Sequence, residues 1–312
     1  MQAENEPCPE IEYEPSHFDK EGRLICYFGW DDDSTRAFVS RVFSTLDLRG
    51  GEKHEFHIPE LGSKAHELKG LALHCSGVLE GLEQFSNIES LNVGSWPKNG
   101  LNLAMFGKLK SLSIDAVKKA DRQLSRLPCL EDISTIGYSE QDCSAFSGMN
   151  PLRSLFFSQG RLRTLQGLES CPSLSSLELA YIRNLEDMEA IHGLGTLENI
   201  WLENLPKVTG RLSLQKYPDL KSFYASKVNL IVDVSGLRKL QNMQKLWLNL
   251  PFEGLDWKDI FMLPDMKRVG ISTEKGIPGD EEFHRLAERH GKPLKEITRI
   301  GKRKPKAVQL KF

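Results

Sequence analysis

The stretch Leu174-Ser-Ser-Leu177-Glu-Leu179 decides the fold of this chain, because its pattern occurs ten times in the sequence. Each copy has an apolar residue, two variable residues, an apolar residue, one variable residue and a last apolar residue. The copies open at Leu68, Ile88, Leu109, Leu130, Leu152, Leu174, Leu197, Leu220, Met243 and Met266. They follow one another at intervals of 20 to 23 residues. A fixed period of this length, with Leu at fixed offsets, predicts a solenoid of stacked repeats.

The spacing of apolar residues within one repeat predicts its local structure. Leu177 and Leu179 are two residues apart, as in a strand that points alternate side chains to opposite faces, so Glu178 is expected to face outward. Between strands the spacing changes to three, as at Leu162, Leu165 and Leu168. Side chains three residues apart eclipse on a 3₁₀ turn. We therefore expect about ten parallel strands on a concave face, with 3₁₀ or short helical turns on a convex face.

The repeats resemble the leucine-rich-repeat family, in the class of about 22 residues found in bacterial internalins and in a protein phosphatase regulatory subunit. The resemblance covers about Gly62 to Pro278. It implies an α/β leucine-rich-repeat solenoid that offers a long surface for binding. The family usually has Asn or Cys three residues after the last strand Leu, where this chain has Ser76, Trp96, Val117, Tyr138, Gly160, Ile182, Leu205, Val228, Pro251 and Glu274. Other groups are therefore expected to satisfy the backbone between repeats.

The two ends of the chain lack the repeat and are expected to cap the solenoid. We predict an αβ cap over residues 1–61, repeats over 62–278, and a helix with a basic tail over 279–312. In the first segment, residues 23–30 and 55–58 are predicted strands. A helix with Asp33 or Ser34 as N-cap is predicted between them from the spacing of Phe38, Val39, Val42, Phe43 and Leu46. Near the other end, Asp280 to His290 is a predicted helix.

The composition of the 312 residues sets limits on location and partners. The formal net charge is −2 with 27% charged residues, which gives no overall bias toward nucleic acid or an anionic membrane. No apolar stretch approaches 18 residues, and the acidic start is unlike a signal peptide. Neither secretion nor membrane insertion is therefore expected. The six cysteines, Cys8, Cys26, Cys75, Cys129, Cys143 and Cys171, show no paired spacing. Free thiols and a cytoplasmic location are expected.

The termini carry opposite charge. Residues 1–33 hold ten acidic side chains against Lys20 and Arg23. The last 21 residues hold eight bases against Glu296: Lys292, Lys295, Arg299, Lys302, Arg303, Lys304, Lys306 and Lys311. Two interpretations stay open. The basic tail either contacts phosphate or an acidic partner, or is a solvated segment that keeps the end of the solenoid soluble.

The outward position at the centre of each strand gives the strongest indication of function. Along the stack these positions are Ala72, Asn92, Ser113, Ser134, Phe156, Glu178, Trp201, Tyr224, Trp247 and Gly270. Four aromatic residues thus occur in five consecutive repeats, and Trp and Tyr are enriched at interface hot spots. The predicted partner-binding residues are Phe156, Glu178, Trp201, Glu203, Tyr224, Lys245, Trp247 and Arg268. The alternative is that the aromatic rings stack on one another or lie beneath the folded-back tail.

The sequence contains none of the phosphate-loop, dinucleotide, hydrolase or zinc-protease motifs. His54 and His57 are interpreted as cap residues and not as metal ligands, and Asp31 to Asp33 as an acidic helix start. No catalytic residue, metal or cofactor is predicted.

We therefore expect a non-enzymatic, cytoplasmic protein that is monomeric when free and binds one protein partner, with no role at a membrane. It is similar to the small immunity proteins with which bacteria neutralise a toxin. A regulatory or scaffolding subunit of an enzyme, and a nucleic-acid binder acting through the tail, are the alternatives.

Overall fold

The structure is a computed structural model that describes residues 16–18, 22–41, 43–115, 123–273, 276–300 and 306–312. The chain forms two compact units, Met1–Leu109 and Lys110–Phe312, called here the first and the second unit. The boundaries expected at residues 61 and 278 separate repeats from caps, whereas the two compact units meet at Leu109 and Lys110. The expected boundaries therefore stay predictions.

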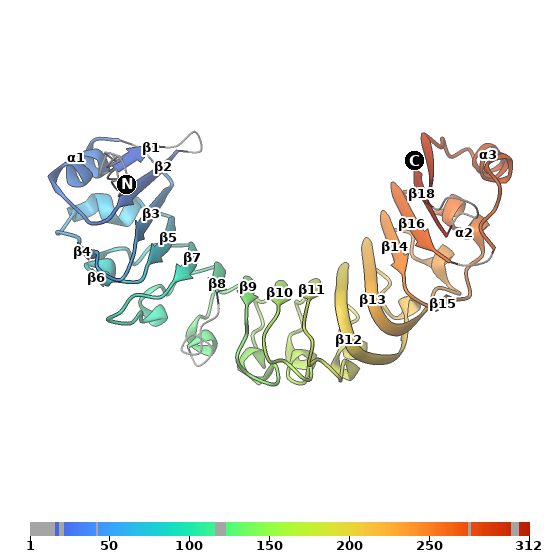
Figure 1. The fold of residues 1–312 in the computed structure, drawn as a ribbon, viewed down its shortest axis with the longest axis horizontal. Coiled ribbons are helices and arrows are strands. Elements are labelled where there is room, and N and C mark those ends of the chain that lie inside the picture. Colours follow the sequence, from blue (N-terminus) through green and yellow to red (C-terminus); the bar gives the residue numbers. More distant parts are fainter. Residues whose placement is uncertain (1–15, 19–21, 42, 116–122, 274–275, 301–305) are drawn as a thin grey trace, which may run out of the picture. The chain divides into compact units, whose positions relative to one another are not determined.

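The second unit is built on a ladder of parallel strands in chain order, each hydrogen-bonded to the next (Figure 1). These strands are β8 (Ser111–Asp115), β9 (Asp132–Ile136), β10 (Ser154–Ser158), β11 (Ser176–Ala180), β12 (Asn199–Ser213), β13 (Ser222–Asp233), β14 (Lys245–Asn249) and β16 (Arg268–Ser272). Each begins two residues after the opening residue of its repeat. The short strand β15 (Phe252–Glu253) pairs with the far end of β13. The predicted solenoid of parallel strands is confirmed.

The first unit has a parallel ladder of its own, with β2 (Arg23–Tyr27), β3 (Thr45–Gly50), β5 (Gly70–Cys75) and β7 (Ser90–Ser95) in order. Strand β1 (Ser16–Phe18) pairs antiparallel with β2. A separate pair joins β4 (Glu55–His57) to β6 (Val78–Glu80). The parallel ladder therefore begins well before the first recognisable repeat.

Short 3₁₀ helices connect the strands, as the three-residue spacing predicted. They are η1 (Gly62–Glu67), η2 (Leu82–Gln84), η3 (Leu103–Met105), η4 (Leu124–Arg126), η5 (Ser144–Phe146), η6 (Leu168–Ser170), η7 (Glu189–Gly193), η8 (Leu214–Lys216) and η9 (Leu237–Lys239). The helix α2 (Trp257–Met262) takes this place before β16. Within the second unit the strands lie on the inner side of the bend and these turns on the outer side (Figure 1).

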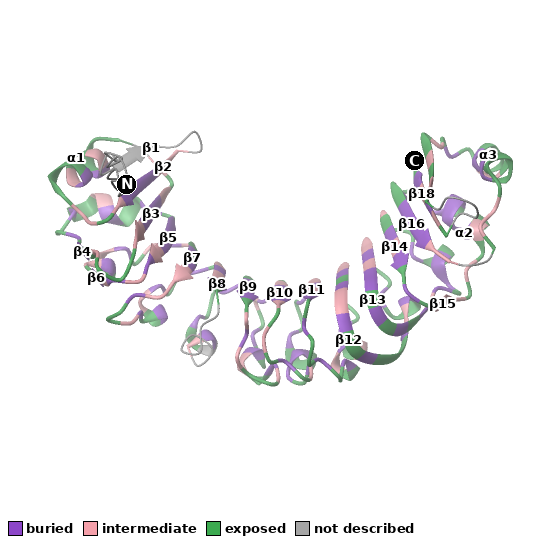
Figure 2. Ribbon diagram, in the orientation of Figure 1, coloured by how far each residue is buried: buried purple, intermediate pink, exposed green. Residues whose placement is uncertain are grey.

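The core lies between the strands and the turns of each repeat. Leu177 and Leu179 are fully buried, while Glu178 between them is half-buried on the opposite face, so the predicted alternation is confirmed. The same alternation runs along the neighbouring strands (Figure 2). Leu162, Leu165 and Leu168 are also fully buried. Each repeat thus closes its core against the next one, which is how a solenoid grows without a single central core.

Backbone hydrogen bonds join each repeat to the next on both sides of the strands. The carbonyl of Arg153, directly before β10, accepts hydrogen bonds from the N–H groups of Ser175 and Ser176, both at 2.9 Å. The residue before the strand accepts two such bonds in seven further repeats: Lys69, Lys110, Glu131, Ser175, Glu198, Lys221 and Gln244. Four residues are left-handed, with φ of 52° to 62°: Gln159 and Tyr181 just after β10 and β11, and Asn204 and Lys227 within β12 and β13. The N–H of Tyr181 there donates to the carbonyl of Glu203 at 2.8 Å.

The N-terminal segment differs from its prediction at the helix N-cap and in two strands, β1 and β3, that were not predicted. The helix α1 (Asp32–Ser40) is present, but its N-cap is Asp31, whose carboxylate accepts from the N–H of Ser34 at 2.7 Å. Leu46, predicted on the helix, lies in strand β3 and is fully buried. Leu46 and Leu48 alternate with Asp47 in β3, and pairing with β5 favours the strand over the helix that local spacing indicated.

The C-terminal segment contains the predicted helix, α3 (Asp280–Arg289), and two strands that were not predicted. Phe283 of α3 is fully buried against Trp257 and Phe261. Strand β18 (Ala307–Lys311) pairs antiparallel with β16, and β17 (Glu296–Ile300) pairs with β18. The basic tail is therefore in part a continuation of the sheet. Val308 and Leu310 of β18 are buried, and their spacing of two residues is that of a strand with one buried face.

The described cysteines are all free thiols. Cys129 is exposed, and the buried cysteines are Cys26, Cys75, Cys143 and Cys171. Burial raises the pKa of the Cys26 thiol to about 12 and also raises the pKa of Cys143. Cys8 lies outside the described residues. None of the helices in the described ranges is long and apolar enough to cross a membrane.

Candidate functional site: an aromatic row on the strand face

Six outward positions form one row across the strand face of the second unit, which is the sheet surface that points away from the core. Strand pairing puts Phe156 of β10 beside Glu178 of β11, and Glu178 beside Trp201 of β12. The row continues to Tyr224 of β13, Trp247 of β14 and Gly270 of β16. We call Phe156, Trp201, Tyr224 and Trp247 the aromatic row. The residues that the sequence pattern aligned are thus direct neighbours in the sheet.

Three of the four aromatic rings stack on one another. The ring centroids of Trp201 and Tyr224 are 3.7 Å apart with an interplanar angle of 10°. Tyr224 and Trp247 are 6.1 Å apart at 18°. The stack ends over Gly270, because a Cβ atom built there would lie 2.2 Å from Cε3 of Trp247. Because Gly270 has no side chain, the indole of Trp247 can lie against the backbone of β16.

Stacking covers part of the rings and leaves part accessible. Trp201 is 38% exposed, and Phe156, Tyr224 and Trp247 are half-buried. The alternative in which the rings stack on one another therefore describes three of them, but Glu178 separates Phe156 from the stack. The described part of the tail does not fold over the row, since β17 and β18 are strands of the same sheet. Gln309 of β18 lies beside Gly270 in the register.

Glu203 is held in a fixed position beside the row. Its carboxylate accepts a hydrogen bond from Nε1 of Trp201 at 3.2 Å and one from the hydroxyl of Tyr181 at 2.9 Å. The hydrogen bond to Glu203 raises the pKa of Tyr181. Tyr181 is 47% exposed and was not predicted as a site residue. It follows β11 in a left-handed conformation, and that position carries no apolar periodicity that would have drawn attention to it.

The two predicted cations lie on the other side of the row. Lys245 and Arg268 begin β14 and β16, are neighbours in the register, and are exposed. Neither side chain has a hydrogen bond or ion pair within the described ranges. A cavity of about 250 Å³ lies next to Arg268 and is also lined by Trp247 and by residues of β17 and β18 such as Glu296 and Gln309. The row thus has carboxylates toward β11 and β12 and cations toward β14 and β16.

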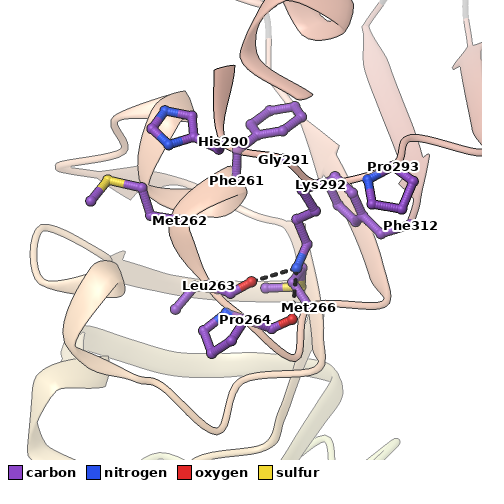
Figure 3. Close-up of a pocket in the computed structure, with 10 residues that line it drawn as sticks. All are labelled: Phe261, Met262, Leu263, Pro264, Met266, His290, Gly291, Lys292, Pro293 and Phe312. Atoms are coloured by element: carbon purple, nitrogen blue, oxygen red, sulfur yellow. Dashed lines mark hydrogen bonds between the residues drawn. The ribbon is translucent and has the colours of Figure 1, made fainter. Parts of the chain in front are cut away.

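Several bases of the tail have structural contacts. The ammonium of Lys292 is buried and donates to the carbonyls of Leu263 and Pro264, just after α2 (Figure 3). Burial lowers the pKa of Lys292. It lies in a cavity of about 570 Å³ whose lining includes Phe261 and Phe312. This ammonium group satisfies the carbonyl of the C-cap residue Leu263 and that of the next residue, Pro264, so Lys292 caps the end of α2.

Of the remaining tail bases, two have side-chain contacts, Lys306 and Lys311 are exposed, and three lie outside the described residues. Arg299 pairs with Asp280 of α3 at 2.6 Å, and Lys295 donates to the carbonyl oxygen of Phe312 at 3.1 Å. Lys302, Arg303 and Lys304 lie outside the described residues. Of the eight bases, Lys292, Lys295 and Arg299 therefore hold the C-terminal segment together.

The histidine and aspartate groups considered as metal ligands have other contacts. Nδ1 and Nε2 of His57 lie 2.8 Å from Glu80 and 3.2 Å from Glu55, and His54 accepts from the N–H of Gly51 at 2.9 Å. The hydrogen bonds to Glu80 and Glu55 raise the pKa of His57. Within the part of the chain that the structure describes, no group of three or more His, Cys, Asp or Glu side chains could hold a metal ion.

Comparison with known proteins bears on the fold. No protein-family model matches the sequence, and no curated protein matches it. Among solved structures, an internalin (inlF) of Listeria monocytogenes has a TM-score of 0.50 and 14% identity over 82% of this chain and 87% of that one. The functional domain of InlJ from Listeria monocytogenes has a TM-score of 0.45 and 15% identity, over 93% of this chain and 60% of that one. Identities this low concern the fold alone. With the period, the parallel ladder and the 3₁₀ turns, the likeness to the inlF internalin shows that this chain is a leucine-rich-repeat solenoid.

Proposed function

We propose that this protein binds a protein partner on the strand face of its second unit, and that it does so without catalysing a reaction. The observation that carries the proposal is the aromatic row, in which stacked rings lie on a sheet surface with Trp201 38% exposed. Large aromatic side chains with a polar tip dominate the energetics of protein interfaces. Phe156, Tyr224 and Trp247 are the further anchors.

The rigidity of this surface supports tight binding. Trp201 is fixed by its stack on Tyr224 and by its hydrogen bond to Glu203, which also binds Tyr181. Side chains that are ordered before binding lose less conformational entropy on association, so more of the contact energy appears as affinity. The charges within and beside the row, Glu178 between Phe156 and Trp201, Glu203 on one side, and Lys245 and Arg268 on the other, would select a partner of complementary pattern.

The finer proposal is that this protein is a cytoplasmic immunity protein that inhibits a cognate toxin. Inhibition of this kind needs only that a rigid surface occludes the active site of another protein, and it needs no chemistry from the inhibitor. A row of anchors on strands, and not on mobile loops, suits that task. This part of the proposal rests on analogy with small immunity proteins.

The first test is affinity capture from lysate of the source cell with three immobilised proteins: the wild type, Trp201→Ala/Trp247→Ala, and Ile231→Ala/Met262→Ala. Ile231 and Met262 are exposed apolar residues, 37% and 46% accessible, that lie outside the row. We expect a partner that the wild type and the Ile231/Met262 control retain and that the tryptophan variant loses. Circular dichroism checks that each variant is folded.

The second step tests what binding does to the purified partner. A toxin whose activity is abolished at equimolar wild-type protein, and restored when the tryptophan variant replaces it, supports the immunity role. An enzyme that stays active in the complex would instead indicate a regulatory subunit. Retention of the partner by the tryptophan variant would contradict the strand-face site. If neutralising Lys302, Arg303 and Lys304 then abolished a strongly salt-dependent binding, the tail would be the site.

A further inference from the structure

Glu178 is the one charged residue within the row, and it lies between two aromatic side chains. Its neighbours in the register are Phe156 on β10 and Trp201 on β12. Glu178 is half-buried, and no hydrogen bond or ion pair of its carboxylate exists within the described ranges. A carboxylate that is partly withdrawn from water without a partner is unfavourable, and a bound cation would remove that cost.

The two aromatic side chains lie at a distance that suits a cation between them. Adjacent strands are about 4.8 Å apart, so Phe156 and Trp201 project from strands separated by about 9.6 Å. A cation midway would lie about 5 Å from each ring, within the reach of about 6 Å for a cation–π contact. One face of Trp201 is covered by Tyr224, and among the described residues no aromatic ring stacks on the other face, which lies on the side of β11.

The charges around Glu178 favour a cation over an anion. Glu203 lies one strand away, with its carboxylate at the edge of Trp201. The other residues on this face of β11 and their remaining register neighbours are neutral: Ser176 and Ala180 on β11, Ser154 and Ser158 on β10, and Asn199 on β12. Lys245 begins β14, three strands from β11 and so about 14 Å away, which exceeds the screening length of about 8 to 10 Å at physiological salt.

We propose that Phe156, Glu178 and Trp201 form a cradle for an arginine side chain of the protein partner. Arginine fits better than lysine because its planar guanidinium stacks on aromatic faces, forms a bidentate pair with a carboxylate, and is more weakly hydrated. The inference rests on the proposed function and names the group that the partner inserts between β10 and β12. Arginine is also enriched among interface hot spots.

The direct test titrates the full protein with N-acetyl-arginine methylamide and follows tryptophan fluorescence and the indole N–H resonance of Trp201. The matched probe is N-acetyl-citrulline methylamide, which has nearly the same shape and no charge. The matched variants are Glu178→Gln and Glu189→Gln, the latter changing an exposed glutamate on the turn side of the same unit. We expect the arginine probe to perturb the indole signal of Trp201, and Glu178→Gln to weaken its binding about tenfold or more.

Equal responses to the arginine and citrulline probes, or equal affinities in the Glu178→Gln and Glu189→Gln variants, would overturn the cradle. Trp201→Phe keeps a ring in place and, followed through the backbone amide resonance of Glu178, should weaken binding of the arginine probe without unfolding the chain. Binding of the captured partner to the variants distinguishes a failure of this inference from a failure of the proposed function. If Trp201→Ala/Trp247→Ala loses the partner while Glu178→Gln keeps full affinity, the strand-face site stands and the cradle is wrong. If the double variant keeps the partner, both are wrong.

Discussion

The substitution Gly270→Ala tests how the aromatic stack is built. A Cβ atom at this position would lie 2.2 Å from Cε3, 2.4 Å from Cζ3 and 2.7 Å from Cδ2 of Trp247. Real Cβ atoms essentially never come this close, so the indole of Trp247 has to move. The backbone itself offers no obstacle, because Gly270 is not in the left-handed region.

Two opposing effects set the size of the change. Replacing Gly by Ala where the backbone permits stabilises a protein by about 0.4 to 1 kcal/mol, since the unfolded chain loses freedom. Displacing Trp247 costs about 1 to 3 kcal/mol as overpacking and also weakens its stacking on Tyr224, worth about 0.5 to 1.5 kcal/mol. We therefore expect Gly270→Ala to lower the free energy of unfolding by about 1 to 3 kcal/mol.

The assay is denaturant unfolding followed by far-ultraviolet circular dichroism and tryptophan fluorescence, in a cycle with Trp247→Ala. Once the indole is removed, Gly270→Ala should become neutral or stabilising, so the sign of its effect changes between the two backgrounds. Gly195→Ala is the control, because the nearest atom to its Cβ is the carbonyl oxygen of Lys216 at 3.7 Å. If Gly270→Ala and Gly195→Ala change the free energy of unfolding by the same amount in both backgrounds, Trp247 does not lie on β16 as described.

Three further predictions concern titratable groups. Glu203→Gln should lower the pKa of Tyr181 toward 10, seen by ultraviolet difference titration, because the hydrogen bond to the carboxylate raises that pKa; an unchanged titration would contradict the contact. The His57 pKa should lie above 6.5 by NMR and fall in Glu80→Gln; this ion pair stabilises the fold at low pH and is lost as the pH rises through the His57 pKa. A thiol reagent at pH 8 should label Cys129 in the native protein and spare the buried cysteines, as mass spectrometry would show.

The sequence by itself determined the repeat. Leu at fixed offsets can be buried in every repeat only if each strand pairs with the next, so the period alone predicts the parallel ladder and the outward row from Phe156 to Gly270. Spacings of three predicted the 3₁₀ turns for the same local reason. Both predictions follow from the repeat pattern, and neither needs a contact between unrelated segments that are far apart in the sequence.

Only the tertiary structure decided the features that depend on non-repeating contacts. Leu46 fits a helix by local spacing, yet pairing with β5 places it in a strand. The basic tail becomes β17 and β18 because the exposed edge of β16 accepts another strand. The stacking of Trp201 on Tyr224 and the bond from Tyr181 to Glu203 depend on side-chain rotation and on one left-handed residue. A periodic pattern fixes which face a side chain takes, but the direction of the side chain on that face is set by its neighbours in space.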